Sequence, residues 1–290
     1  MSERPPHPTL GVIGGTGLYH LEGLKHLRTV EVETPFGPPS SPIVLGDLEG
    51  RVVAFLARHG EGHRFLPHEV NYRANLYALK ALGVERVVGV TACGSLREEI
   101  APGDFVIPDQ LLDFTKRRPA TFFGEGVAAH IAFAEPYCPD LSRWAADALE
   151  AAGARVHRGG TYLIVDGPRF STRAESHLFR RWGADIIGMT AVPEAQLARE
   201  AELCFVSLAH VTDYDCWREE EEPVTNEMVL RRLRANVEVA RRALPHLVRR
   251  LPPERTCACG SALATALGTA PDAIPPEARE RLRLLLKKYL

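Results

Sequence analysis

Short apolar runs rich in Val, Ile and Leu recur along the chain, and they predict the strands of a sheet. These runs are Leu10–Ile13, Ile43–Leu45, Val52–Leu56, Val87–Val90, Phe105–Ile107, Tyr162–Val165, Asp185–Ile187 and Leu203–Val211. Segments with helical periodicity lie between several of them: Asn71–Leu82, Leu141–Ala152 and Ala191–Glu202. Nearly continuous apolar strands that alternate with helices predict an α/β fold with a central, largely parallel or mixed sheet flanked by helices.

The last third of the chain predicts a long helix and a separate extension. After Pro223, five apolar residues at helical spacing form one face: Val229, Leu233, Val237, Ala240 and Leu244. Pro252 and Pro253 then break the helix, and the tail ends in an amphipathic helix whose shared face is Ala278, Leu282, Leu285 and Tyr289. We therefore expect an extended or disordered tail over 1–8, a main domain over 9–250, and an extension over 251–290. The extension packs on that domain or on a neighbouring subunit.

Composition and charge narrow the class of protein. The chain has 290 residues, 45% of them hydrophobic, and 35 basic against 37 acidic residues give a net charge of −2. This balance offers no broad electrostatic surface for nucleic acid or an anionic membrane. No apolar run approaches the roughly 18 residues of a membrane span, and the polar, Pro-rich start lacks the apolar core of a secretion signal. We expect a soluble protein of the cytoplasm.

The six cysteines include one close pair, Cys257-Ala-Cys259. In a cytosolic chain of this length, free thiols are the usual state, and a local disulfide is the alternative for this pair in a hyperthermophile. A zinc site would need a second pair, or histidines at ligand spacing nearby, and none follows in the sequence. We therefore expect a structural pair and no metal site.

Small, polar or charged residues gather just after the apolar runs. The clusters are Gly14–Gly17, Arg58–Gly60, Thr91–Ser95, Gly167–Phe170, Met189–Thr190 and Thr212–Asp215. In open α/β sheets, ligands bind outside the carboxyl ends of the strands, so these clusters are expected to converge on one pocket.

Each cluster alone has two interpretations. Gly14–Gly17 is either a tight turn or a cradle of backbone N–H groups and the Thr16 hydroxyl for an anion; it is not a dinucleotide loop, because His20 stands where the third glycine belongs. Arg58 and His59 are either a surface pair or donors to phosphate. Asp213 and Asp215 project to one side of an extended segment, as a solvated turn or as a pair of carboxylates that reads a base.

Taken together, the polar blocks resemble a known family. They are GGTG at 14–17, ARHG at 57–60, NYRAN at 71–75, TACGSLREEI at 91–100, GPRFSTRAE at 167–175, MT at 189–190 and TDYDCW at 212–217. In this order, from about residue 9 to about residue 245, they resemble the S-methyl-5′-thioadenosine phosphorylases. That family is the adenine-handling branch of the trimeric purine nucleoside phosphorylases.

The resemblance implies a single α/β domain, a homotrimer with active sites at subunit interfaces, and no metal or organic cofactor, with inorganic phosphate as co-substrate. The family's phosphate contacts carry over to Thr16, Arg58, His59, Thr91, Ala92 and Thr190. Its purine contacts carry over to Phe170, Ser171, Asp213 and Asp215, and its ribose contact to Met189.

The resemblance also implies a pocket for the 5′-alkylthio group. His63 and Val229 line it, and His130 reaches in from the next subunit. Asn226, one helical turn before Val229, departs from the family, whose members often carry a small apolar residue there. An amide at this position is compatible with a 5′-hydroxyl, so the strict preference for a thioether is open.

The implied reaction is phosphorolysis of S-methyl-5′-thioadenosine to adenine and 5-methylthioribose 1-phosphate. Asp213 would hold or deliver the proton at purine N7, and Asp215 would accept from the exocyclic amine. Three alternatives stay open: a phosphorylase of broader or 6-oxopurine specificity, a nucleosidase that uses water, and a nucleoside-binding protein without turnover. The 6-oxopurine enzymes use Asn where Asp213 stands and Glu where Ser171 stands.

Overall fold

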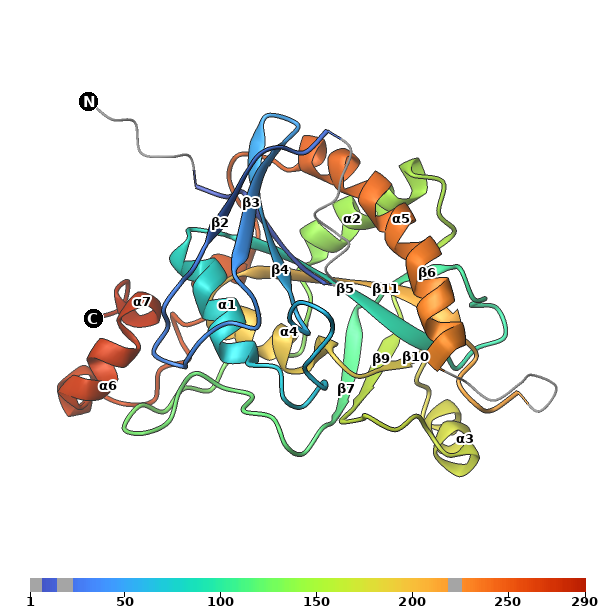
Figure 1. Cartoon of the computed structure of the whole chain (residues 1–290). Coiled ribbons are helices and arrows are strands. Elements are labelled where there is room, and N and C mark those ends of the chain that lie inside the picture. Colours follow the sequence, from blue (N-terminus) through green and yellow to red (C-terminus); the bar gives the residue numbers. More distant parts are fainter. Residues whose placement is uncertain (1–6, 15–22, 219–225) are drawn as a thin grey trace.

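A large mixed sheet runs through the molecule, which a computed structural model describes over residues 7–14, 23–218 and 226–290, without the side chains of 226–236 (Figure 1). Its strands are β1 Leu10–Gly14, β2 Lys25–Val30, β3 Ile43–Leu48, β4 Arg51–Ala57, β5 Arg86–Ser95, β6 Phe105–Ile107, β7 Gln110–Phe114, β8 Val156–Arg158, β9 Thr161–Val165, β10 Ile186–Gly188 and β11 Cys204–Asp213. The main path is β2-β3-β4-β1-β5-β10-β9-β7, and β11, β6 and β8 join beside β5. The predicted α/β fold with a mixed sheet is confirmed.

Strand β5 is the branch point of the sheet. It pairs in parallel with β1 and with β11, while its last residues pair antiparallel with β10, where Ser95 lies opposite Ile186. Because β1, β10 and β11 all border β5, their polar residues come near one another, and Arg58 after β4 joins them through its hydrogen bond to the Val90 carbonyl of β5. This arrangement positions the polar clusters.

Helices cover both faces of the sheet. They are α1 Tyr72–Ala81, α2 Pro139–Ala151, α3 Arg173–Arg181, α4 Ala191–Glu200, α5 Asn226–Arg250, α6 Pro276–Arg281 and α7 Arg283–Leu286, with short 3-10 turns η2 Ala258–Ser261 and η3 Pro271–Ala273. Helices α2 and α5 pack on one face through buried residues such as Leu141 and Leu244. Helices α1 and α4 pack on the other face, together with the extension after residue 250.

Local sequence explains where several helices begin. The Asn71 side chain accepts from the Ala74 N–H and caps α1, and Pro139 occupies the first turn of α2. Thr172 and Glu175 form a capping box at the start of α3. Each device suits the start of a helix, where backbone N–H groups have no partner within the helix.

The structure differs from the sequence prediction in three ways. Strands β5 and β11 continue through Thr91–Ser95 and Thr212–Asp213, so those polar blocks lie within the strands and do not follow them. The strands β2, β7 and β8 and helix α3 were not predicted, because their residues are too polar or too few to form an apolar run. The terminal helix is broken at Leu282 into α6 and α7, although Ala278, Leu282 and Leu285 are buried on one face as predicted. Among the described helices, none combines the length and apolarity that a membrane crossing requires.

Candidate active site

A buried ion pair forms the deepest part of the site. Arg58 directly follows β4, and its Nε and Nη2 donate to the Glu194 carboxylate at 2.5 and 2.9 Å, while Nη1 donates to the Val90 carbonyl at 3.0 Å. Arg58 is 3% exposed and Glu194 is fully buried. The bidentate contact with Glu194 fixes the guanidinium plane. Together with the Val90 contact it uses three of the five N–H groups of Arg58, which leaves two for an anion.

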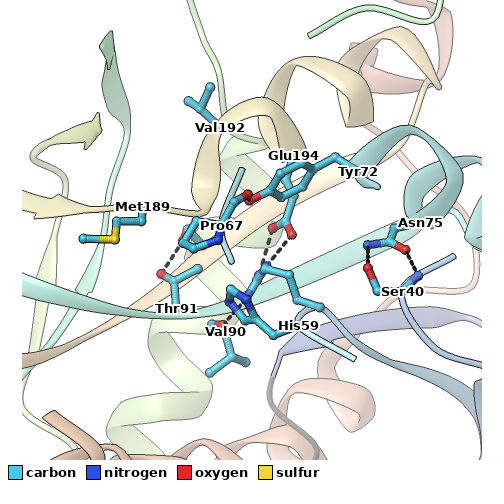
Figure 2. A network of polar contacts seen from close by, with 12 residues as sticks. Ser40, His59, Pro67, Tyr72, Asn75, Val90, Thr91, Met189, Val192 and Glu194 are labelled. Atoms are coloured by element: carbon cyan, nitrogen blue, oxygen red, sulfur yellow. Dashed lines mark hydrogen bonds and ion pairs between the residues drawn. The ribbon is translucent and has the colours of Figure 1, made fainter. Parts of the chain in front are cut away.

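Glu194 is a site residue that the sequence did not reveal. Burial alone would lower the pKa of Arg58, but the charge and hydrogen bonds of Glu194 outweigh it and raise that pKa. Gly89 makes room for the carboxylate, because a Cβ at this position would lie 3.1 Å from Glu194 Oε2. The pair therefore holds a permanent, oriented cation beside the Val90 carbonyl of β5, and Figure 2 shows Glu194 and Val90 near Thr91 and His59.

Thr91 adds a hydroxyl next to the guanidinium. The Tyr162 hydroxyl donates to Thr91 Oγ1 at 3.3 Å, and Ser207 Oγ lies 3.2 Å from the same atom. In the arrangement in which both the Ser207 and the Tyr162 hydroxyls donate to Thr91 Oγ1, the Thr91 hydroxyl can donate its own proton to an anion. Ala92 is half-buried beside it, and its carbonyl lies 3.4 Å from the Tyr162 hydroxyl.

Thr190 lies directly before α4, and its hydroxyl is not used to cap the helix. It is the N-cap residue, its side chain makes no capping hydrogen bond, and it is 8% exposed. The non-helical dihedrals of Val192 and Pro193 delay the regular helix to Glu194. Thr190 therefore belongs to an irregular loop between β10 and α4.

Arg118 holds that loop in place, and the sequence did not predict it. Its Nη1 donates to the carbonyls of Met189 at 2.6 Å and Val192 at 2.5 Å, and its Nη2 donates to the Asp166 carbonyl at 3.0 Å. Because Arg118 is 9% exposed, its charge is stabilised mainly by these carbonyls and by Asp166, whose carboxylate lies 3.6 Å from Nε. One side chain thus ties the loop after β9 to the loop after β10.

His59 is a neutral member of the group. Its Nδ1 lies 2.8 Å from the Phe65 carbonyl, which can only accept, so Nδ1 carries the proton. Burial and then the positive charge of Arg58 lower the pKa of His59 to about 4. At neutral pH Nε2 is therefore an acceptor, suited to the hydroxyl of a protonated phosphate. His63 is exposed and stacks on His59 with ring centroids 4.3 Å apart.

The two carboxylates of β11 and the turn after it form a second polar centre. Asp213 is 6% exposed; its Oδ2 accepts from Thr212 Oγ1 at 2.6 Å and its Oδ1 from the Asp215 N–H at 2.8 Å. A β-bulge lies between Val211 and Asp213, which is how the strand turns this side chain toward Gly94. A Cβ at Gly94 would lie 2.8 Å from Asp213 Oδ1, so the close approach requires glycine.

Asp215 differs from Asp213 in its surroundings. Burial raises the pKa of Asp215, while the hydroxyls of Ser176 and Ser171 act in the opposite direction. The Cys216 thiol donates to the Ser171 carbonyl at 3.3 Å, so the 167–173 segment is fastened next to the two carboxylates. Phe170 in that segment is 41% exposed, and Met189 is half-buried.

The two centres lie on neighbouring strands at a useful separation. Thr91 is on β5, and Asp213 pairs with Gly94, three residues further along the same strand. Three strand residues span about 10 Å. We refer to the group around Arg58, Glu194 and Thr91 as the anion end, and to the group around Asp213, Asp215 and Ser171 as the carboxylate end.

Several predicted site residues are not brought into this group. His130 is exposed and lies beside the extension, where its backbone N–H donates to the Ala266 carbonyl at 2.8 Å. Thr16 lies outside the described residues, and so do the side chains of Asn226 and Val229.

The geometry places a buried cation with N–H groups suited to an anion near two carboxylates suited to a hydrogen-bond donor, on neighbouring strands of an α/β fold. A family model described as the phosphorylase superfamily matches residues 9–249. The S-methyl-5′-thioadenosine phosphorylase of Geobacter sulfurreducens is 54% identical over 282 residues, covering 97% of this chain and 99% of the relative. That of Koribacter versatilis is 52% identical over 280 residues, covering 97% and 96%.

Solved structures agree with the sequence relatives. A methylthioadenosine phosphorylase from an antarctic soil metagenomic library is 46% identical and superposes with a TM-score of 0.93, covering 97% of this chain and 100% of the other. The Schistosoma mansoni methylthioadenosine phosphorylase in complex with adenine is 37% identical with a TM-score of 0.86, covering 91% of this chain and 100% of the other. The chain therefore belongs to the phosphorylase superfamily, and within it to the S-methyl-5′-thioadenosine phosphorylases.

Proposed function

We propose that this protein cleaves S-methyl-5′-thioadenosine with inorganic phosphate, which gives adenine and 5-methylthioribose 1-phosphate. Relatives that carry this activity in their names are more than half identical over nearly the whole chain. The structural observation that carries the proposal is a buried, oriented guanidinium beside Thr91, together with two carboxylates that lie about 10 Å further along β5, next to Gly94. Phosphate fits the first and a purine fits the second, with the ribose between them.

The reaction breaks the bond between ribose C1′ and the purine and forms a bond from C1′ to a phosphate oxygen. As the glycosidic bond stretches, positive charge develops on the ribose, and phosphate held by Arg58 and Thr91 is both nucleophile and counter-charge. The departing purine gains a proton at N7, which Asp213 holds or delivers. General acid help of this kind contributes roughly 10²- to 10⁴-fold.

The remaining contacts are assigned as the resemblance implies. Phosphate is contacted by Thr16, Arg58, His59, Thr91, Ala92 and Thr190; the purine by Phe170, Ser171, Asp213 and Asp215; and the ribose by Met189. The 5′-methylthio group is contacted by His63, Asn226 and Val229. Inorganic phosphate is the co-substrate, and the chemistry as written needs no metal or organic cofactor. The cytoplasmic location stays a prediction.

We also propose that the active form is a homotrimer in which His130 of one subunit completes the site of the next. His130 is exposed and lies against the extension, which is compatible with a residue that serves a neighbouring site. Sedimentation would detect the assembly. A fully active monomer at assay concentrations would refute the shared site.

A single assay tests the function. Purine release from S-methyl-5′-thioadenosine, adenosine and inosine is measured with and without phosphate. We expect release to require phosphate and the methylthio substrate to be preferred. Equal release without phosphate would indicate a nucleosidase, and equal efficiency with inosine would refute the assignment of Asp213 and Ser171 to a 6-aminopurine.

A further inference from the structure

Four cysteines from distant parts of the chain meet at one point. Cys138 is the N-cap of α2, Cys204 is the first residue of β11, and Cys257 and Cys259 lie at the start of η2. Their sulfur atoms all lie within 4.8 Å of one another. Three of the four are buried and Cys257 is half-buried. Cys138 and Cys204 thus supply the second cysteine pair that a zinc site would need and that the sequence near Cys257 and Cys259 does not contain.

The spacing suits one ion at the centre better than two disulfides. Four thiolates around zinc at about 2.3 Å form a tetrahedron with edges of about 3.8 Å. The Cys204 and Cys257 sulfurs are 3.3 Å apart, and none of the four forms a disulfide. Disulfides join sulfurs in separate pairs at about 2.05 Å. Here Cys204 interacts with Cys138 and Cys259 as well as with Cys257.

The surroundings complement negative charge on the sulfurs. The N-terminus of the 13-residue helix α2 lies at Cys138, so the positive end of the helix dipole faces the sulfurs. Arg199 Nη1 lies 3.9 Å from Cys259 Sγ. The four sulfurs are therefore bordered by a helix N-terminus and a basic residue, both of which favour negatively charged sulfur ligands.

We propose that Cys138, Cys204, Cys257 and Cys259 bind Zn²⁺ as a structural site that fastens the extension over 251–290 to the start of β11. In binding, each sulfur forms one Zn–S bond, and every thiol that is still protonated loses its proton to solvent. Cys204 and Asp213 are the two ends of β11, nine residues apart, so the ion lies about 30 Å from the reaction. The site is therefore independent of the proposed phosphorolysis.

The extension that this site fastens contacts the segment of His130. Ala129 pairs with Leu267, and the Gly268 N–H donates to the Ala128 carbonyl at 2.9 Å. Residues of the extension such as Leu263 and Leu282 also pack in the same core cluster as α1. A zinc ion bound by Cys257 and Cys259 would therefore stabilise the contacts of the extension with α1 and with the segment of His130.

The first experiment uses the full-length wild-type protein, purified in reductant and made metal-free under argon. Titration with Co²⁺ should end at one ion per chain, with the strong visible absorption of tetrahedral thiolate cobalt, and Zn²⁺ should displace it. A reduced protein that binds neither ion would overturn the proposal. So would an isolated protein with no zinc and four of its six thiols lost to disulfides in a denatured thiol count.

Variants assign the ligands. Cys257→Ser and Cys138→Ser should each reduce the metal retained after dialysis against a chelator to a small fraction of one per chain. Cys93→Ala, at a buried cysteine outside the cluster, should keep one ion per chain. In the wild type, metal removal should speed hydrogen exchange in residues 251–290 before it affects β11. Equal metal content in Cys257→Ser and Cys93→Ala would reject the assignment.

Discussion

The two ends of the active site are built in opposite ways. At the anion end, Arg58, Glu194 and Thr91 are 3% or less exposed, and each is fixed in place by hydrogen bonds to other protein groups. At the carboxylate end, Asp213 is buried, but Phe170 is 41% exposed and Ser171 is half-buried. The anion end is therefore preorganised before a ligand binds, whereas the carboxylate end is partly open to solvent.

This difference follows from what each end must recognise. Phosphate has a fixed shape and charge, so donors fixed in advance cost no reorganisation during the reaction. A purine is a flat ring that is distinguished by a few edge atoms, and an open site admits it and releases it. We therefore expect changes at the anion end to affect folding and phosphate use together, and changes at the carboxylate end to affect the choice of base.

The largest effect is expected from Arg58→Ala. It leaves the fully buried Glu194 carboxylate without its partner, and breaking a buried pair in this way costs about 3–5 kcal/mol of unfolding free energy. The double variant Arg58→Ala/Glu194→Gln should recover most of that stability in urea unfolding and still use phosphate poorly.

Arg97→Ala is the matched control for this change. Arg97 pairs with Asp185 at 2.6 Å, but both side chains are partly exposed, so about 0–1 kcal/mol is expected. If Arg58→Ala were no more destabilising than Arg97→Ala, the anion end would not be the preorganised end of the site.

Asp213→Asn tests the carboxylate end. The amide cannot hold the N7 proton as a carboxylate does, so kcat/KM for S-methyl-5′-thioadenosine should fall by roughly 10²- to 10⁴-fold. Because Asn at this position suits a 6-oxopurine, inosine cleavage should rise, more so with Ser171→Glu added. Asp104→Asn, at a buried carboxylate outside the site, should leave the ratio of the two substrates unchanged. An unaltered preference in the double variant would contradict the base assignment.

The pH dependence should report Asp215. Its pKa is raised by burial, and the ionised form is the acceptor for an exocyclic amine, so kcat/KM should decline on the acid side from a pH above the usual range of an aspartate. The contribution of Asp215 to folding stability depends on pH in the opposite direction to its contribution to activity. The folded state binds this proton more tightly than the unfolded state, so the favourable contribution at low pH is lost as pH rises through the raised pKa.

Ser176→Ala offers a sharp check on that acid limb. The Ser176 hydroxyl lowers the pKa of Asp215, so its removal should move the limb to higher pH while the rate at the plateau changes little. Profiles of kcat/KM for wild type and variant measure the shift. A limb that stays in place would assign it to a different group.

Sequence patterns predicted much of the fold and one partner of each polar centre, but not the groups that hold them. Arg58, Thr91 and Asp213 were found because they lie at or near the ends of apolar strands. Glu194 is 136 residues from Arg58, and Arg118 is 71 residues from Met189, so no local period links either pair. The same reason hid the cysteine cluster, because Cys138 and Cys204 are far from Cys257 along the chain. The topology of the fold determines which distant side chains meet, and local sequence patterns carry no information about it.

The smallest effect is expected from Ser207→Ala, and it separates the two ends most cleanly. Ser207 is fully buried on β11, and its hydroxyl is 3.2 Å from that of Thr91. Without it, the Thr91 hydroxyl loses one of the two hydroxyl neighbours that fix its orientation. The loss of one neutral hydrogen bond costs about 1 kcal/mol, or about fivefold in the KM for phosphate. The ratio of S-methyl-5′-thioadenosine to inosine efficiency should not change, because Ser207 pairs with Gly89 and not with the residues at Asp213. Ser142→Ala on α2 controls for the loss of a serine hydroxyl elsewhere and should leave both quantities unchanged. A changed substrate ratio in Ser207→Ala would mean that the two ends are coupled through β11.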